Sequence, residues 1–119
     1  MITRTTLAVL LALSSSAVTY AHAMLDRANP PVGGTVGSAP RAVSLTFTEK
    51  LEPAFSTIRV ENASGERVDA GKPQVERGSG NVLRVGLKSL PPGSYKVIWK
   101  VLSVDTRTTE GSFSFQVGR

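Results

Sequence analysis

The sequence predicts an all-β domain, a sandwich or a small barrel, preceded by a secretory signal peptide. Three observations carry this prediction. Large apolar residues alternate with polar ones in five short runs, turn-forming residues separate these runs, and the chain begins with a short apolar segment. After that segment, no stretch keeps a helical period of 3.6 over about ten residues.

The first 21 residues have the parts of a signal peptide. Arg4 supplies the positive charge, residues 7–13 form a continuous apolar run, and small residues continue to Ala23. The apolar run is too short to span a bilayer, which takes about 20 residues. The alternative is a buried core helix, but no amphipathic partner lies nearby in the sequence. We therefore expect residues 1–21 to be a signal peptide and residues 22–119 to form one domain.

The alternation predicts each strand and the face that it buries. Successive side chains of a strand point to opposite faces, so each apolar set lines one side of its strand. The predicted strands are residues 43–47, 57–61, 83–87, 95–101 and 112–117. Residues typical of turns lie in the segments between them: Asn29-Pro30-Pro31 with Gly33-Gly34, Asn62–Gly65, Gly78–Asn81 and Pro91-Pro92-Gly93.

Two details of the strand at residues 95–101 bear on the architecture. Tyr95 follows a Pro-Pro-Gly turn, as in the tyrosine corner of an immunoglobulin-like sandwich, although the same pattern also occurs at ordinary turns into strands. Ile98 and Leu102 face away from the predicted core. The strand is therefore either central and covered in part on both sides, or it presents an exposed patch to a partner.

Composition narrows the class of protein. The chain has 119 residues, no cysteine and a net charge of +5, which becomes +4 without the signal peptide because Arg4 is its only charged residue. The absence of cysteine excludes thiol catalysis, zinc–thiolate sites and iron–sulfur clusters. The basic residues are scattered along the chain, whereas nucleic-acid-binding proteins usually concentrate them on one element. We therefore expect that the protein does not bind nucleic acid. We also expect it to be a monomer.

The only histidine, His22, is the main chemical candidate. A catalytic triad would depend on this terminal residue, and no spacing singles out a pair of carboxylates, so we expect no enzyme. If the signal peptide is cleaved after Ala21, the α-amine and the imidazole of His22 can chelate one metal ion. Nitrogen and oxygen donors favour Cu(II). Local cleavage rules also allow cleavage after Ala23, which would remove His22.

Four segments of the sequence together form a recognisable pattern: residues 22–31 (HAMLDRANPP), 39–49 (APRAVSLTFTE), 90–100 (LPPGSYKVIWK) and 103–115 (SVDTRTTEGSFSF). Over nearly all of the predicted domain, this pattern resembles the CopC family of periplasmic copper-binding and copper-resistance proteins. The resemblance implies an immunoglobulin-like Greek-key β-sandwich of about seven strands, located in the periplasm. It also implies a mature chain that starts at His22.

The resemblance further implies a set of copper ligands. Carried over to this sequence, the family's Cu(II) ligands are His22, Asp105 and, as in some members, Glu49. The family's Asp-x-His motif reads Asp105-Thr106-Arg107 here, and an arginine has no lone pair to donate. The methionine-rich Cu(I) loop of some members is missing, and Met24 is the only methionine after the signal peptide.

Two hypotheses about function follow from this resemblance. The first is a Cu(II)-binding protein of copper resistance or homeostasis, with a weakened site. The second is a binding module that has lost the metal and acts with an inner-membrane copper transporter of the CopD type.

Overall fold

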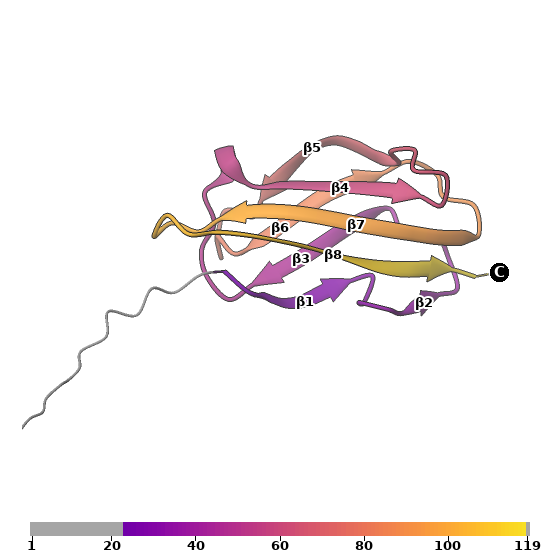
Figure 1. The fold of residues 1–119 in the computed structure, drawn as a ribbon, viewed down its shortest axis with the longest axis horizontal. Helices are drawn as coiled ribbons and strands as arrows, with labels where there is room; N and C mark the ends of the chain where they lie inside the picture. The colour runs from indigo at the N-terminus through magenta and orange to yellow at the C-terminus, as the bar shows by residue number, and fades with distance from the viewer. Residues whose placement is uncertain (1–22, 119) are drawn as a thin grey trace, which may run out of the picture.

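The computed structural model of the protein describes residues 23–118, which form eight strands (Figure 1). The predicted signal peptide and His22 lie outside the described residues. The strands are β1 (Leu25–Asn29), β2 (Thr35–Val36), β3 (Ala42–Phe47), β4 (Thr57–Asn62), β5 (Asp69–Val75), β6 (Val82–Leu87), β7 (Gly93–Leu102) and β8 (Thr108–Val117). Residues 23–118 contain no α-helix, only a 3₁₀ turn, η2 (Pro53–Phe55), and no helix long and apolar enough to cross a membrane.

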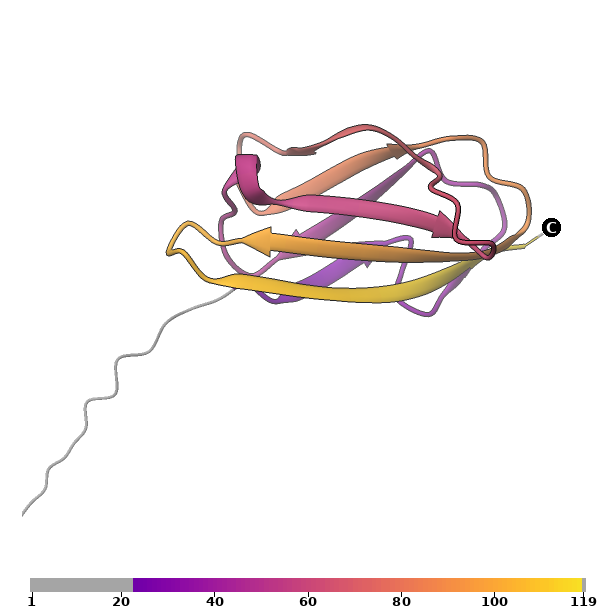
Figure 2. The same ribbon diagram turned by 45° about the horizontal axis from the view of Figure 1, so that its top comes forward.

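The strands form two four-stranded sheets that face each other (Figure 2). One sheet has the order β1-β3-β6-β5, and the other has the order β2-β8-β7-β4. The chain passes from one sheet to the other at most connections, and only β5–β6 and β7–β8 are hairpins within a sheet. This is the Greek-key β-sandwich that the resemblance implies, and it decides between the sandwich and the small barrel that the alternation predicts. It has one strand more than the expected seven, because the two residues of β2 pair in parallel with the end of β8.

The core lies between the sheets and consists of the predicted apolar faces. All five predicted strands are present, as β3, β4, β6, β7 and β8, and their inward side chains are buried apart from the half-buried Leu87. Two aromatic pairs lie in the core, one between the sheets and one between the neighbouring strands β7 and β8. Phe47 meets Trp99 edge-on with ring centroids 5.1 Å apart, and Tyr95 stacks on Phe115 at 5.6 Å. Such pairs add specific ring geometry to the burial of apolar area that stabilises the sandwich.

The strand β7 settles the two details that the sequence raised about it. The Tyr95 hydroxyl donates a hydrogen bond to the carbonyl oxygen of Pro91, which confirms the tyrosine corner. β7 lies between β4 and β8, and Ile98 and Leu102 are half-buried on its outer face. The strand is therefore central and covered in part on both sides, which was the first of the two alternatives.

Candidate metal site

The first described residues are fixed at one end of the sandwich. Ala23 is fully buried, and its carbonyl oxygen accepts a hydrogen bond from Thr109 Oγ1 at 2.7 Å. Met24 exchanges two hydrogen bonds with Thr48: its N–H donates to Thr48 Oγ1, and its carbonyl oxygen accepts from the Thr48 N–H, both at 2.9 Å. The backbone of residues 23 and 24 therefore lies between the end of β3 and the beginning of β8.

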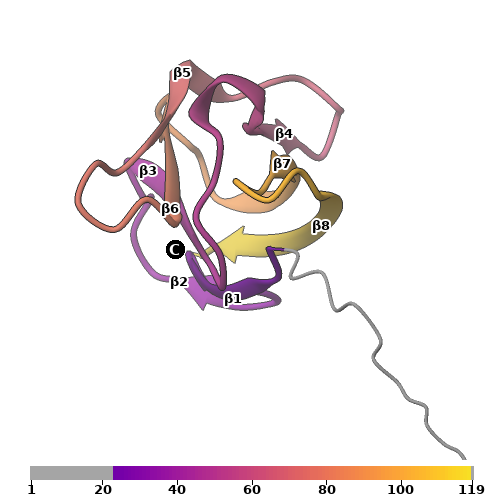
Figure 3. The same cartoon turned by 90° about the vertical axis from the view of Figure 1, so that its left-hand side faces the viewer.

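Glu49 lies just after β3, in a segment that is hydrogen-bonded both to Met24 and to the β7–β8 turn. Its preceding neighbour, Thr48, is bonded to Met24, and its following neighbour, Lys50, accepts a hydrogen bond from the Val104 N–H at 3.0 Å. Leu51 forms an isolated β-bridge with Ser103 in the same turn. Glu49 is half-buried. The segment that carries Glu49 thus lies at the end of the sandwich where β1 begins and β7 turns into β8 (Figure 3).

The β7–β8 turn, residues 103–107, is organised around the hydroxyl of Ser103. Ser103 is fully buried, and its Oγ donates a hydrogen bond to Asp105 Oδ1 and accepts one from the Arg107 N–H at 3.3 Å. Thr106 has a positive φ of 71°, which closes the turn at a residue type that rarely adopts it. The Asp105 side chain is exposed, and one of its carboxylate oxygens is thereby held by Ser103.

Charges of both signs surround this end of the molecule. Asp105 and Glu49 supply carboxylates, whereas Arg107 and Lys50 are exposed cations on the same segments. Arginine stays protonated at any ordinary pH. Arg107 therefore contributes a fixed positive charge two residues from Asp105.

The structure brings two of the three predicted site residues to the same end of the sandwich. Glu49 and Asp105 lie on segments that are hydrogen-bonded to each other through Lys50 and Val104. His22 directly precedes Ala23 in the sequence and lies outside the described residues. Within residues 23–118, no three histidine, cysteine or acidic side chains gather in a group that could hold a metal ion.

Sequence reasoning missed the hydroxyl side chains that hold these segments: Thr48, Ser103 and Thr109. A signal for Thr109 is present in the sequence. Its inward-facing register follows if the alternation of Phe113 and Phe115 is extended towards the N-terminus of β8. The alternation of Trp99 and Val101, extended by two residues, likewise places Ser103 on the inward face. The hydrogen bonds of its hydroxyl depend on a turn conformation that the alternation does not specify.

Comparison with known proteins identifies the family. The CopC domain matches residues 25–118. Copper resistance protein C of Xanthomonas campestris pv. juglandis is 32% identical over 119 residues, which cover 95% of this chain and 93% of that protein. The copper transport protein CutJ of Bacillus subtilis is 32% identical over 101 residues, 84% of this chain, but the match spans only 19% of CutJ.

A solved structure supports the same assignment. The crystal structure of CopC from Methylosinus trichosporium OB3b superposes with a TM-score of 0.77 and 31% sequence identity, over 82% of this chain and 94% of that one. The family match, the relatives and the two-sheet architecture agree with the resemblance carried by the four sequence segments. The protein therefore belongs to the CopC family.

Proposed function

We propose that the protein binds Cu(II) at the end of the sandwich, through the α-amine and imidazole of His22 with Asp105 and Glu49 as oxygen donors. One observation carries this proposal. The chain is fixed at Ala23, one residue after His22, between the segment that bears Glu49 and the strand that follows the Asp105 turn. In this proposal His22, the preceding residue in the sequence, supplies the nitrogen donors beside these two segments.

The chemistry of the donors fits Cu(II). A free α-amine has a reference pKa of about 7.7–8.0 and an imidazole one of about 6.5, so a metal ion can displace both protons near neutral pH. Amine and imidazole nitrogens with carboxylate oxygens suit the tetragonal geometry of Cu(II), which also heads the Irving–Williams order. This donor set requires cleavage of the signal peptide after Ala21, so that the domain comprises residues 22–119.

Arg107 makes the proposed site weaker than a site with two histidines. It stands where the family motif has an imidazole ligand, and it can only add positive charge near the metal. Two carboxylates offset part of this charge. We therefore expect Cu(II) to be held by His22 and oxygen donors, with lower affinity than in relatives that keep the second imidazole.

The biological role that we propose is copper resistance or homeostasis in the periplasm, as a binding protein without catalytic activity. The names of the relatives support a role with copper, because they denote copper resistance and copper transport. In CutJ the matching segment is about a fifth of a longer chain. We further propose an inner-membrane copper transporter of the CopD type as the partner, and a monomer as the oligomeric state.

A Cu(II) titration of the exported, processed protein tests the proposal. Expression of the full-length chain with its own signal, followed by N-terminal sequencing, should give a chain that starts at His22. This protein should bind one Cu(II) with a dissociation constant below micromolar. A His22→Ala variant should lose most of this affinity, and so should a chain that starts at Met24. Micromolar or weaker binding by the wild-type protein would contradict the proposal.

The second hypothesis, a module without metal, is favoured by Arg107 at the position of the expected imidazole. It predicts no stoichiometric Cu(II) binding, together with retained association with a CopD-type membrane protein. Pull-down with the metal-free domain, in the presence of a copper chelator, separates it from the first hypothesis. Association that persists unchanged with chelator and with His22→Ala would support the module.

A further inference from the structure

The outer edge of β8 is open over about half of the strand. One edge of β8 pairs with β7 along the whole strand. On the other edge β2 covers only the end, where Thr35 and Val36 lie opposite Gln116 and Val117 (Figure 1). β1 belongs to the opposite sheet, where it pairs with β3. Within residues 23–118, the segment Thr108–Ser112 is therefore a sheet edge without a neighbouring strand.

The backbone groups that point out of this edge follow from those that β2 already uses. Along an antiparallel strand, residues whose N–H and C=O both point to the partner alternate with residues whose groups both point away. The Ser114 carbonyl oxygen accepts a hydrogen bond from the Gly33 N–H at 2.8 Å. The Gln116 N–H donates to the Gly34 carbonyl oxygen at 2.9 Å. Even-numbered residues of β8 thus point away from β7, and those within 108–112 point out of the open edge.

The edges of β1, β4 and β5 differ from this one because each is blocked or interrupted. Proteins use bulges, prolines and covering segments to keep sheet edges from pairing with other chains. The pairing of β1 and of β5 shifts register, and β5 contains Pro73. In β4, the Val60 N–H donates to Asp69 Oδ1, and the Val60 carbonyl oxygen accepts from the Val68 N–H. Residues 108–112 have an unbroken register with β7 and no proline.

The side chains of the open edge are small, with one exception. Thr108, Glu110 and Ser112 are exposed on the outer face of the sheet, and Glu110 is the only charged residue in the segment. In β7, Lys100 lies directly opposite Glu110. An added strand would place a second residue beside Glu110, on its other side. Opposite charges in such cross-strand pairs are stabilising, and like charges are destabilising.

This single carboxylate decides which kind of strand fits the edge. A second copy of the chain that pairs antiparallel about the centre of the segment would place its own Glu110 opposite Glu110. Two carboxylates would then face each other, which disfavours self-pairing at neutral pH. A lysine or arginine at the same position would instead form a favourable pair.

We infer that residues 108–112 of β8 are a docking edge for an extended segment of a partner protein, which adds as an antiparallel strand with a lysine or arginine opposite Glu110. In this mode of recognition the backbone hydrogen bonds provide affinity and the side chains provide specificity. The edge is continuous with the part of β8 that already accepts β2. The inference goes beyond the proposed function, because it needs neither His22 nor copper.

Amide hydrogen exchange in the metal-free protein tests whether the edge is open. The Thr109 and Gly111 amides point to β7 and should be protected, whereas the Glu110 and Ser112 amides should exchange rapidly. Equal protection of all four amides would overturn the inference, since the edge would then already be covered.

Two short peptides test the partner chemistry. The probe is acetyl-Thr-Val-Lys-Val-Thr-amide, whose sequence reads the same in both directions, and its control has glutamate in place of lysine. In an NMR titration the lysine peptide should shift and protect the Glu110 and Ser112 amides. It should bind about 5-fold or more tightly than the glutamate peptide. Glu110→Lys, an exposed substitution, should reverse this preference.

A proline variant tests the backbone contact separately. Ser112→Pro removes an N–H that points away from β7, so the pairing of β7 with β8 should persist while both peptides lose binding. Binding that survives in a folded Ser112→Pro variant would overturn the inference, and so would a peptide preference that Glu110→Lys leaves unchanged. Dimerisation of the wild type at neutral pH with protection of the Glu110 amide would make a second copy the occupant and would also overturn it.

Discussion

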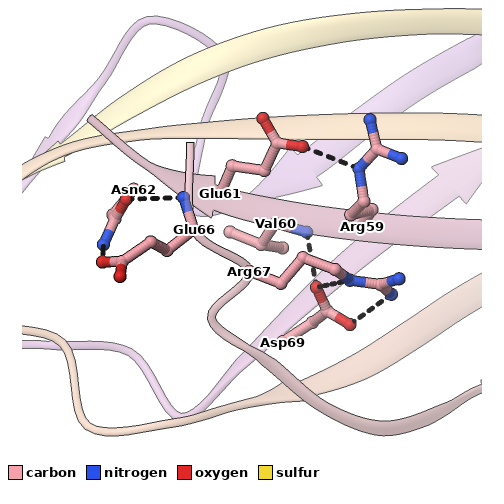
Figure 4. A network of polar contacts seen from close by, with 7 residues as sticks. All are labelled: Arg59, Val60, Glu61, Asn62, Glu66, Arg67 and Asp69. Carbon is pink, nitrogen blue, oxygen red and sulfur yellow. Dashed lines mark hydrogen bonds and ion pairs between the residues drawn. The ribbon is translucent and has the colours of Figure 1, made fainter. Parts of the chain in front are cut away.

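At the scale of single residues, Asp69 of β5 forms an ion pair with Arg67 and a hydrogen bond with β4, away from the candidate metal site (Figure 4). Asp69 Oδ1 accepts a hydrogen bond from the Val60 N–H at 2.9 Å, and both its oxygens accept hydrogen bonds from Arg67. The Asp69 side chain is only 5% exposed. Burial raises the pKa of Asp69, but the hydrogen bonds from Arg67 and Val60 outweigh it, so the pKa lies below the usual value of 3.8.

This lowered pKa predicts acid sensitivity. A carboxyl group with a lower pKa in the folded state contributes stability above its unfolded pKa, and this contribution is lost as pH falls through the folded value. Asp69→Asn should lower the free energy of unfolding at pH 7 by about 1–3 kcal/mol. The variant should also depend less steeply on pH below about 4 than the wild type. Urea unfolding at several pH values measures both effects.

The exposed Glu66 gives the control for Asp69. Its carboxylate accepts a hydrogen bond from Asn62 Nδ2 within the β4–β5 turn. Glu66→Gln should change the free energy of unfolding by less than about 0.5 kcal/mol at pH 7, as surface substitutions usually do. If Asp69→Asn behaved like Glu66→Gln, the buried carboxylate would not stabilise the fold as argued.

Substitution of Arg107 tests the proposed metal site at a single residue. Arg107→His removes a positive charge and offers an imidazole two residues from Asp105, within the turn that Ser103 organises. Cu(II) binding should tighten by about 10-fold or more, since a ligand should count for at least as much as an outer partner. A competition titration measures the change. An unchanged affinity would mean that position 107 lies outside the metal's reach.

At the scale of elements, the contact between β7 and β8 depends on a glycine. Gly111 pairs with Trp99, and a Cβ at Gly111 would lie 2.6 Å from Cζ2 of the indole ring. Gly111→Ala should therefore displace Trp99 and destabilise the domain by about 1–3 kcal/mol. Trp99 is the only tryptophan, so its fluorescence reports both the displacement and the unfolding.

A second glycine serves as the control for Gly111. A Cβ at Gly37 would meet no atom within 4 Å. Gly37→Ala should leave the fluorescence spectrum unchanged and the free energy of unfolding nearly so. A loss of stability of the same size in both variants would point to backbone entropy or strain, and the packing of Trp99 on β8 would not be its source.

The strands that could be predicted from the sequence and the strands that could not differ in their position within the two sheets. The five predicted strands include the four central ones, β3, β6, β7 and β8, whose alternation is unbroken. The missed strands, β1, β2 and β5, are at sheet edges. The register shifts in β1 and again in β5, where Gly71 and Pro73 interrupt the pattern, and β2 has two residues. Bulges and edge prolines break the two-residue period on which such prediction depends.

The candidate site, too, could be predicted from the sequence only in part. The resemblance to the family provided Glu49, Asp105 and the unusual Arg107. The contacts that bring their segments together run between residues far apart in the chain, such as Thr109 with Ala23 and Val104 with Lys50. Tertiary structure alone determines such pairs, so the sequence predicted candidate ligands but not the hydroxyl groups that hold them.

At the scale of the whole molecule, the sandwich separates stability from the proposed metal site. The buried aromatic pairs and the central strands form the core, while residues 23–24, the segment after β3 and the β7–β8 turn lie at one end (Figure 1). The fold therefore needs no metal to bury its core. Substitution of Glu49 or Asp105 should affect metal binding more than folding.

Copper should nevertheless stabilise the processed protein through mass action. At a free Cu(II) concentration of about 100 times the dissociation constant, the free energy of unfolding should rise by about 2.7 kcal/mol. For a domain of this size, such a gain raises Tm by roughly 10 °C or more. The chain that starts at Met24 should show no comparable rise. Equal rises in both chains would indicate binding elsewhere on the surface.

The most direct test of the central claim is the EPR spectrum of one equivalent of Cu(II) on the processed protein. We expect a tetragonal signal with nitrogen and oxygen ligands, since the α-amine and the imidazole of His22 bind together. Extension of the chain by one alanine before His22 separates the amine from the imidazole, and the signal should then be lost or changed to that of weakly bound copper. An identical spectrum for both chains would contradict the claim that the chain start is the copper ligand.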